Sequence, residues 1–366
     1  MVEWKTIGEF ATLQKTKNKK HLTENAYSIT QAGLVPTKSF FKEKTNITSS
    51  DTSGYYIVEK DWFVYSPSRI DVGSINYLRD EGPVIVSPID VVFSVDTKVC
   101  LPAYLLEYFF TYKGKNDMLK KREGVEGMGR RNLPFEAIKG ISIPIPSLSE
   151  QQRIVGILDM FTASIDNLKA QIDQRRKQYE YYRDQLLDLE GKAGVEMKSL
   201  GDSCFIKTGS KPSEIKDRGR CKYVNAGTTE SGYVDASNCD GDVVTTPSRG
   251  QGGIGYVGYQ SDAFWLGPLC YQIRPNENDI IKPKYLYYYL SSHTEEIMKY
   301  KSEGGTPAVN AVDLKKITIP VPSLSAQRRI VSILDTFELS LRNLECQLKG
   351  REAQYEYYRN KLLTFE

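Results

Sequence analysis

The sequence predicts an α+β fold in which two globular domains are joined by two long antiparallel coiled-coil helices. Three observations predict it. The stretch 143–190 returns as 319–366, each copy carries an apolar residue every three or four positions, and each copy follows a segment that mixes short β-rich runs with helical ones. A chain of 366 residues is long enough for two domains that each bury a core.

The first domain is expected over residues 1–142. Short runs rich in β-branched residues, at 55–58, 84–86 and 91–95, are typical of strands, and an apolar helical run follows at 102–109. Strands and helices mixed in this way favour the α+β class.

The first spacer helix is expected within 143–195. Pro144 and Pro146 force extended backbone, and Ser149 can then cap the helix, with Gln152 completing a capping box. From Leu158 to Leu189 the apolar residues recur three and four apart, which is the a/d pattern of a coiled coil.

The second domain is expected over 196–318 and the second spacer helix over 319–366. The two helical copies align without a gap and more than half of their positions are identical, so the chain contains an internal duplication with pseudo-two-fold character. Each helix is the obvious partner of the other. An antiparallel pair would place the two domains at opposite ends of one rod.

Outside the seam, several residues are identical in the two helices although a coiled coil does not require it. A partner that docks twice would need them; the alternative is a helix that diverges slowly. The predicted partner-binding residues are Gln151, Arg153, Asp159, Gln178, Glu180, Arg183, Gln327, Arg329, Asp335, Gln354, Glu356 and Arg359.

Net charge, cysteine spacing and the length of the apolar runs limit the kinds of partner and site that the protein can have. The net charge of +3 is only mildly basic, so local patches must decide whether nucleic acid is a partner. Six widely spaced cysteines without a C-x-x-C predict neither a zinc site nor a disulfide framework. The N-terminus lacks a signal-peptide pattern and no apolar run could cross a bilayer, which predicts a cytoplasmic protein without a membrane partner.

No catalytic or cofactor motif is found. The sequence lacks an N-P-P-[YF]-type tetrapeptide and a Walker A lysine, and its only histidines are His21 and His293. The stretch "GQGGIG" at 250–255 matches G-x-G-x-x-G but does not lead into a helical pattern, so we interpret it as a glycine-rich turn. We therefore expect no catalysis, no cofactor and no metal.

The layout of variable domain, helix with "IPIPSLSEQQRI", second variable domain and repeated helix resembles the specificity subunit of type I restriction-modification systems. The first domain also resembles one of that family's target-recognition types through "AYSITQAGLVP" and "WFVYSPSRIDVGSI". The resemblance implies that each domain is a target-recognition domain that reads one half of a bipartite double-stranded DNA sequence. It also implies that the helices act as a spacer and bind two copies of a methyltransferase subunit, and that a nuclease and translocase subunit joins the assembly.

Candidate DNA contacts combine basic runs with forked or amide side chains near glycine turns. Arg69 and Arg249 are the sharpest, because each follows Pro-Ser and could hold a guanine or a phosphate with its guanidinium fork. The alternative is an arginine that braces the turn against a carboxylate. The full set is Lys15, Lys17, Lys19, Lys20, Ser68, Arg69, Arg130, Arg131, Lys207, Lys211, Ser248, Arg249, Gln251, Thr306 and Asn310.

Two rival functions stay open on the residues alone. One is a coiled-coil scaffold whose end domains bind proteins, and the other is a cryptic nuclease or methylase. Binding to random duplex DNA with a steep salt dependence would favour the DNA-reading function over both.

Overall fold

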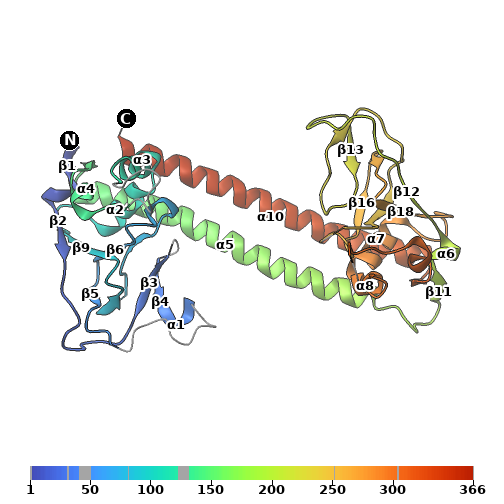
Figure 1. The fold of residues 1–366 in the computed structure, drawn as a ribbon, viewed down its shortest axis with the longest axis horizontal. Helices are drawn as coiled ribbons and strands as arrows, with labels where there is room; N and C mark the ends of the chain where they lie inside the picture. The colour runs from blue at the N-terminus through green and yellow to red at the C-terminus, as the bar shows by residue number, and fades with distance from the viewer. Residues whose placement is uncertain are drawn as a thin grey trace. The chain divides into compact units, whose positions relative to one another are not determined.

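The computed structural model describes residues 2–30, 33–40, 51–80, 82–122, 132–250, 252–302 and 305–365. The chain divides into two compact units (Figure 1). Unit 1 is Met1–Lys169 with Cys346–Glu366, and unit 2 is Ala170–Glu345. Each unit therefore holds one α+β domain and a portion of each long helix.

Unit 1 is built on a four-stranded antiparallel sheet in the order β2-β9-β6-β7. Apolar side chains from this sheet and the following helices form its core, in which the Phe63 and Phe93 rings stack 4.9 Å apart. The strands are β1 (Glu3–Thr6), β2 (Ala11–Gln14), β3 (Tyr27–Thr30), β4 (Gly33–Pro36), β5 (Tyr56–Val58), β6 (Phe63–Tyr65), β7 (Ile75–Tyr77), β8 (Val84–Val86), β9 (Val91–Val95) and β10 (Ser142–Ile145). The helical segments are η1 (Ile7–Glu9), α1 (Thr37–Phe40), η2 (Ile70–Val72), α2 (Pro102–Phe109), α3 (Tyr112–Lys120) and α4 (Phe135–Lys139).

Unit 2 repeats this plan with a sheet in the order β12-β18-β15-β16, again antiparallel. Its strands are β11 (Glu196–Ser199), β12 (Cys204–Thr208), β13 (Cys221–Val224), β14 (Tyr233–Val234), β15 (Val243–Pro247), β16 (Gly258–Gln260), β17 (Trp265–Leu266), β18 (Cys270–Pro275) and β19 (Thr318–Val321). The shorter helices are α6 (Leu200–Ser203), α7 (Pro283–Ser292), α8 (Thr294–Met298) and α9 (Ala311–Leu314). The predicted pair of α+β domains is confirmed.

Each domain ties its first strand to the strand that precedes a long helix. β1 pairs antiparallel with β10, and β11 pairs antiparallel with β19. β10 and β19 span the predicted boundaries at 142/143 and 318/319, so these proline-containing stretches belong to the domain sheets. The long helices begin just after them.

The two spacer helices are α5 (Leu148–Leu187) and α10 (Leu324–Thr364). The predicted cap at Ser149 is wrong, because α5 already begins at Leu148 and the backbone N–H of Glu150 donates to the Ser147 hydroxyl over 3.3 Å. Ser323 accepts from Ala326 in the same way. The serine two residues earlier therefore caps the start of each helix.

α5 and α10 pack antiparallel within each unit. In unit 1 the Phe161 ring of α5 stacks on Tyr358, near the end of α10, with 5.4 Å between centroids. In unit 2 the relation is exchanged, because Tyr182 near the end of α5 stacks on Phe337 in the first half of α10 at 5.5 Å. The duplicated sequence thus makes the same aromatic contact twice, once from each helix.

Two arginines, Arg175 and Arg351, lie in the seam at positions where the heptad pattern would place an apolar residue. The Arg175 guanidinium lies 5.8 Å from the Phe337 ring centroid, and that of Arg351 lies 5.7 Å from the ring of Phe161. Both arginines are half-buried. Each covers a seam phenylalanine with its cation and keeps partial contact with water.

Candidate functional site

The predicted DNA-contact residues cluster at one end of each domain sheet. In unit 1, β2 and β6 are both antiparallel to β9, so they run in the same direction and finish at the same end of the sheet. Gln14 and Val64 even share the partner Val92. The lysine run that starts at Lys15 and the loop that holds Arg69 therefore leave the same end of the sheet, on either side of β9. We call this end of the sheet, where β2 and β6 finish, the arginine end of unit 1.

Unit 2 has the equivalent arginine end, where β12 and β15 finish. Both strands are antiparallel to β18, and Thr208 and Thr246 share the partner Tyr271. Lys211 follows β12, and Arg249 follows β15. The same sheet geometry has therefore brought a lysine segment and a Pro-Ser-Arg loop together twice.

The segment before the second long helix joins this end in unit 2. The N–H of Val309 donates to the Ser248 carbonyl over 2.9 Å, and that of Gly250 donates to the Pro307 carbonyl over 3.0 Å. These backbone bonds fix the segment 306–310 beside the Arg249 loop. The side chains of Thr306 and Asn310 in this segment are exposed. Gly250 has φ +133°, a conformation that a side chain would disfavour.

Unit 1 uses the same construction. The N–H of Leu133 donates to the Pro67 carbonyl over 3.1 Å, so the segment before α4 lies against the Pro-Ser-Arg loop. The predicted residues Arg130 and Arg131 precede this contact but lie outside the described residues, as does Gln251 in unit 2.

Arg69 and Arg249 are both exposed. The bracing alternative would require a carboxylate such as Asp71, whose side chain lies outside the described residues. Among the side chains that the structure describes, none lies within ion-pair distance of either guanidinium. Ser68 is half-buried, and the Ser248 side chain is only 9% exposed. The two serines therefore shape the loops, while the arginines project from them.

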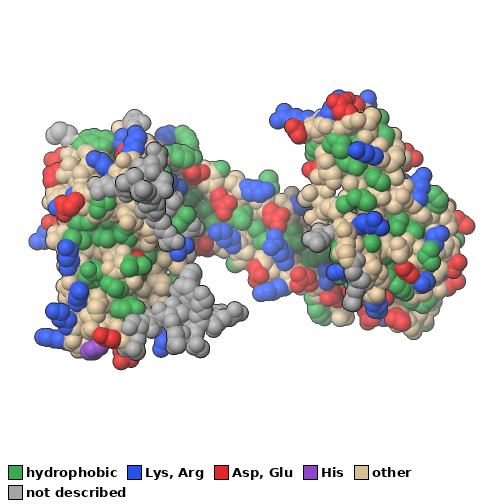
Figure 2. Space-filling view, viewed as in Figure 1, with side chains coloured by type: hydrophobic (Ala, Val, Ile, Leu, Met, Phe, Trp, Pro, Cys, Tyr) green, Lys and Arg blue, Asp and Glu red, His purple; other side chains and the backbone are tan. Residues whose placement is uncertain are grey.

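The predicted lysines are exposed without exception: Lys15, Lys17, Lys19, Lys20, Lys207 and Lys211. Buried Asn18 organises the first run, since its side chain donates to the Thr23 carbonyl over 2.9 Å and accepts from the N–H of Leu22 over 2.9 Å. Figure 2 shows basic and acidic side chains interspersed over the visible face of both units, in keeping with the small net charge. The lysine runs are thus local features of a mixed surface.

Gln151 and Gln327 correct one prediction. They were expected to face a partner, but both are fully buried. The Gln151 amide accepts from the N–H of Leu101 over 2.8 Å and donates to the carbonyls of Val99 and Pro146 over 2.9 and 3.0 Å. Gln327 makes the corresponding three bonds with Lys282, Ile280 and Pro322. The same residue type stands at both positions because each glutamine anchors a domain helix, α2 or α7, on a long helix.

Most other predicted partner residues remain available at the helix surface. Asp159, Gln178, Glu180, Arg329 and Gln354 are exposed. A second group is engaged within the chain to some extent. Arg153 pairs with Glu150, Arg183 and Arg359 lie over the rings of Tyr179 and Tyr355, Glu356 is half-buried, and Asp335 accepts from Tyr288 and pairs with Lys284.

Two exposed tyrosine pairs were missed by the sequence reasoning. Tyr181 and Tyr357 are 62% and 58% exposed, and each packs edge-on against the next tyrosine, with centroids 5.4 and 5.2 Å apart. The signal was present in the repeated "QYEYYR", from which only the glutamine, the glutamate and the arginine were assigned to a partner. Large aromatic rings kept in water at matched positions are typical of interface hot spots.

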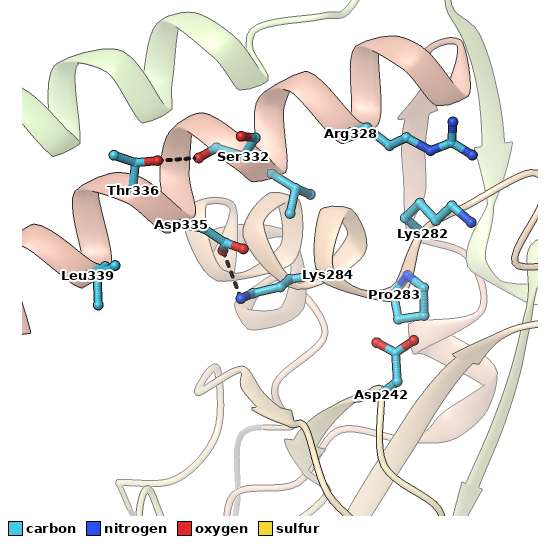
Figure 3. Close-up of a pocket in the computed structure, with 10 residues that line it drawn as sticks. Asp242, Lys282, Pro283, Lys284, Arg328, Ser332, Asp335, Thr336 and Leu339 are labelled. Carbon is cyan, nitrogen blue, oxygen red and sulfur yellow. Dashed lines mark hydrogen bonds and ion pairs between the residues drawn. The ribbon is translucent and has the colours of Figure 1, made fainter.

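A groove of about 550 Å³ lies between α7 and α10 in unit 2 (Figure 3). Arg328 and Lys282 extend in the same direction at one end, while Lys284 pairs with Asp335 over 2.8 Å. Among the α10 residues of this groove, Arg328 and Ser332 correspond to Gln152 and Gly156 of α5, while Val331 and Asp335 match Val155 and Asp159. The lining of the groove is therefore only partly shared between the two helices.

The described residues hold no cluster of three or more His, Cys, Asp or Glu that could ligate a metal ion. The G-x-G-x-x-G stretch connects β15 to β16, two antiparallel strands, as the turn interpretation predicted. Within the described part of the chain, none of the helices combines the length and apolar character needed to cross a membrane.

Comparison with known proteins agrees with this arrangement. The chain matches the type I restriction modification DNA specificity domain over residues 1–175 and 192–349. It is 28% identical to a type I restriction enzyme specificity subunit from Escherichia coli, over 100% of this chain and 94% of that protein. A putative type I restriction enzyme specificity subunit from Haemophilus influenzae is 30% identical over 65% of this chain and 68% of its own length.

Solved structures share the fold. The crystal structure of a type I restriction-modification S subunit from M. genitalium matches with a TM-score of 0.63 and 19% identity, covering 99% of this chain and 96% of that one. A specificity subunit from Thermoanaerobacter tengcongensis matches with a TM-score of 0.52 and 17% identity, over 99% and 95% of the two chains. With its duplicated domains, paired helices and matching sequence, the chain belongs to the type I restriction-modification DNA specificity family, whose members are the non-catalytic specificity subunits of these systems.

Proposed function

We propose that each unit reads one half of a bipartite duplex DNA sequence at its arginine end. The observation that carries this is the repeated geometry. In both units a lysine segment, a Pro-Ser-Arg loop and the segment before a helix converge at the same end of equivalent sheets, yet their side chains differ. A common framework with different side chains suits two domains that read different sequences.

The chemistry at these ends matches what duplex DNA presents. A guanidinium fork such as that of Arg69 or Arg249 can bond guanine O6 and N7 together, and the amide of Asn310 can do the same with adenine N6 and N7. The exposed lysines supply phosphate contacts, which position the protein but carry no sequence information. The chain itself needs no cofactor for this task.

The long helices serve as the docking surface for two copies of a methyltransferase subunit, with a nuclease and translocase subunit completing the assembly in the cytoplasm. The exposed residues that recur in α5 and α10 support a partner that binds twice in equivalent ways. To the predicted set we add the tyrosine pairs Tyr181–Tyr182 and Tyr357–Tyr358, and we remove the buried Gln151 and Gln327.

Methylome sequencing of the host with and without this chain tests the proposal. The expected result is one bipartite methylated motif that disappears when the chain is deleted and returns when it is supplied again. A purified complex should bind duplex DNA with a steep dependence on salt. An unchanged methylome, together with salt-insensitive binding, would favour the protein scaffold instead.

A further inference from the structure

α3 presents a basic surface that the sequence analysis did not assign. The helix and the two residues after it carry Lys113, Lys115, Lys120, Lys121 and Arg122 against a single acidic residue, which is Asp117. Lys115, Lys120 and Lys121 are exposed. Among the described residues, no carboxylate lies within ion-pair distance of these three ammonium groups. Their positive charge therefore faces solvent uncompensated.

The position of α3 is set by close packing. Its first turn is capped by Thr111, whose hydroxyl accepts from the N–H of Gly114 over 2.9 Å. A Cβ at Gly114 would come within 2.1 Å of the Tyr108 carbonyl oxygen, so only glycine lets α3 approach the end of α2 this closely. The N–H of Tyr112 donates to the Asn360 side chain of α10 over 2.7 Å. The first turn of α3 is thus fixed against both α2 and α10.

This placement brings α3 next to the arginine end. α3 packs against η2, the short turn that begins immediately after Arg69. On its other side, Lys113 lies 5.6 Å from the ring of Trp4, which is 50% exposed. A shallow hollow of about 300 Å³ is bounded by this tryptophan together with Lys120 and Lys121.

The corresponding segment of unit 2 lacks this charge. α8 follows α7 as α3 follows α2, but it begins with Glu295 and Glu296, and Lys299 pairs with Glu296 over 2.5 Å. Acidic and basic residues are therefore balanced there. Since the fold forms without a basic helix at this position, the charge of α3 is not a requirement of folding.

We propose that α3 binds phosphates of the DNA duplex that flanks the half-site read by unit 1. This inference rests on the proposed function and extends it to residues outside the arginine end. Ammonium groups on a rigid helix attract the phosphate backbone as point charges and do not discriminate between bases. Unit 1 thereby contacts DNA phosphates outside the half-site that it recognises. Unit 2 makes no such contact through α8, its matching segment.

The test is the salt dependence of DNA binding by the complex that contains the full chain. K120Q/K121Q removes two charges from α3, and K299Q/K301Q removes two from the matching segment of unit 2. Each lost phosphate contact lowers the slope of log K against log salt by about 0.9. The α3 variant should therefore lose about 1.8 from the slope, equally on target and scrambled duplexes, and the control should lose none.

Three outcomes would overturn the proposal: an unchanged slope in K120Q/K121Q, an equal loss in both variants, or a loss of methyltransferase binding with DNA binding intact. The last would assign α3 to a protein partner. A parent complex that does not distinguish target from scrambled duplex would instead refute half-site reading, and the slope comparison on scrambled DNA would still test α3.

Discussion

Gln151 and Gln327 show how one residue type can be kept in two copies for a purely internal reason. Each amide accepts a hydrogen bond from the backbone N–H of the residue just before α2 or α7 and donates to two backbone carbonyls. Both glutamine side chains are fully buried. A buried polar group that loses its partner carries the full cost of desolvation. The two glutamines therefore join each domain to its helix.

Replacing either glutamine by leucine should lower stability sharply. Q151L leaves one buried N–H and two carbonyls without partners, at about 1 to 3 kcal/mol for each group. Thermal denaturation should show a clear fall in Tm, whereas Q178L, the same change at an exposed position of α5, should shift it little. If Q151L kept the parental Tm but lost methyltransferase binding, the original partner role would be restored.

Arg69 and Arg249 should each affect only one half of the DNA target. R69A or R249A should weaken specific binding by about 1 to 3 kcal/mol if the lost contact is bidentate to a base. Binding to a panel of duplexes, each altered in one half-site, would show relaxed preference in the matching half alone. R342A, which removes an exposed arginine from α10 that belongs to neither proposed binding set, serves as the control. Equal weakening on every sequence would assign the two arginines to phosphate.

Asp90 makes stability depend on pH. Burial raises the pKa of its carboxyl to about 7, well above the value of about 3.9 in an unfolded chain. Between these values the folded state holds more protons than the unfolded state, so this group lowers stability as pH rises from about 4 to 7. D90N should therefore be more stable than the parent at pH 8, by on the order of 2 to 4 kcal/mol, and similar at pH 4. Chemical denaturation of D90N and the parent at pH 4 and pH 8 measures this difference, with D80N, a change at an exposed aspartate, as the control. An equal effect of D90N at the two pH values would contradict the prediction.

At the scale of elements, the seam of α5 and α10 is more aromatic than its heptad pattern suggests. Phe161 and Phe337 each stack with a tyrosine ring and lie near an arginine guanidinium. Ring size and stacking geometry make these layers specific to one register. The half-buried arginines cover the phenylalanine rings while their guanidinium groups keep partial contact with solvent.

Changing both seam arginines, Arg175 and Arg351, to leucine should make the protein more stable but the pairing register of α5 and α10 less specific. R175L/R351L buries more apolar surface in the seam and should raise Tm, while mispaired or oligomeric forms appear, because polar seam residues fix register at a cost in stability. Size-exclusion chromatography with light scattering would detect these forms. R176L, beside the seam, would break the 2.6 Å ion pair with Glu345 but should leave the oligomeric state unchanged. A sharp fall in Tm for R175L/R351L would show that the cation–π contacts dominate instead.

At the scale of the whole molecule, we expect the helices to set the distance between the two half-sites. α5 has 40 residues, which corresponds to about 60 Å at 1.5 Å per residue. Adjacent major-groove faces one turn apart are separated by only about 34 to 36 Å. A pair of helices of this length can therefore separate two half-sites by a full turn of DNA.

A matched insertion tests this ruler. Seven residues added after Gln171 and seven after Gln347 preserve the seam and lengthen each helix by about 10 Å, equivalent to about 3 bp. The methylated motif should keep both half-sequences and gain a longer unread spacer, with activity reduced by the changed twist between half-sites. Insertion of four residues at each point, which breaks the seam, should abolish methylation. Altered half-sequences with an unchanged spacer would refute the ruler.

The sequence alone determined the architecture, because the duplication and the heptad pattern are local and periodic. A repeat of 48 residues can be seen without any knowledge of contacts, and a/d spacing predicts paired helices by itself. The Pro-Ser-Arg match between Arg69 and Arg249 was equally visible. Fold class, helix pairing and family followed from these patterns.

Only the tertiary structure decided which repeated residues face solvent and which segments meet. Gln151 and Tyr181 are both repeated polar or amphipathic residues on one helix, yet one is fully buried and the other is 62% exposed. The difference arises because Gln151 lies on the side of α5 that bonds the segment before α2, whereas Tyr181 stays outside the unit 2 core that Leu187 of the same helix joins. No period within the helix encodes which side a domain covers. Likewise, the lysine run and Arg69 are far apart in the chain. They leave the same end of the sheet because two strands share the partner β9, and such long-range pairing depends on the whole sheet.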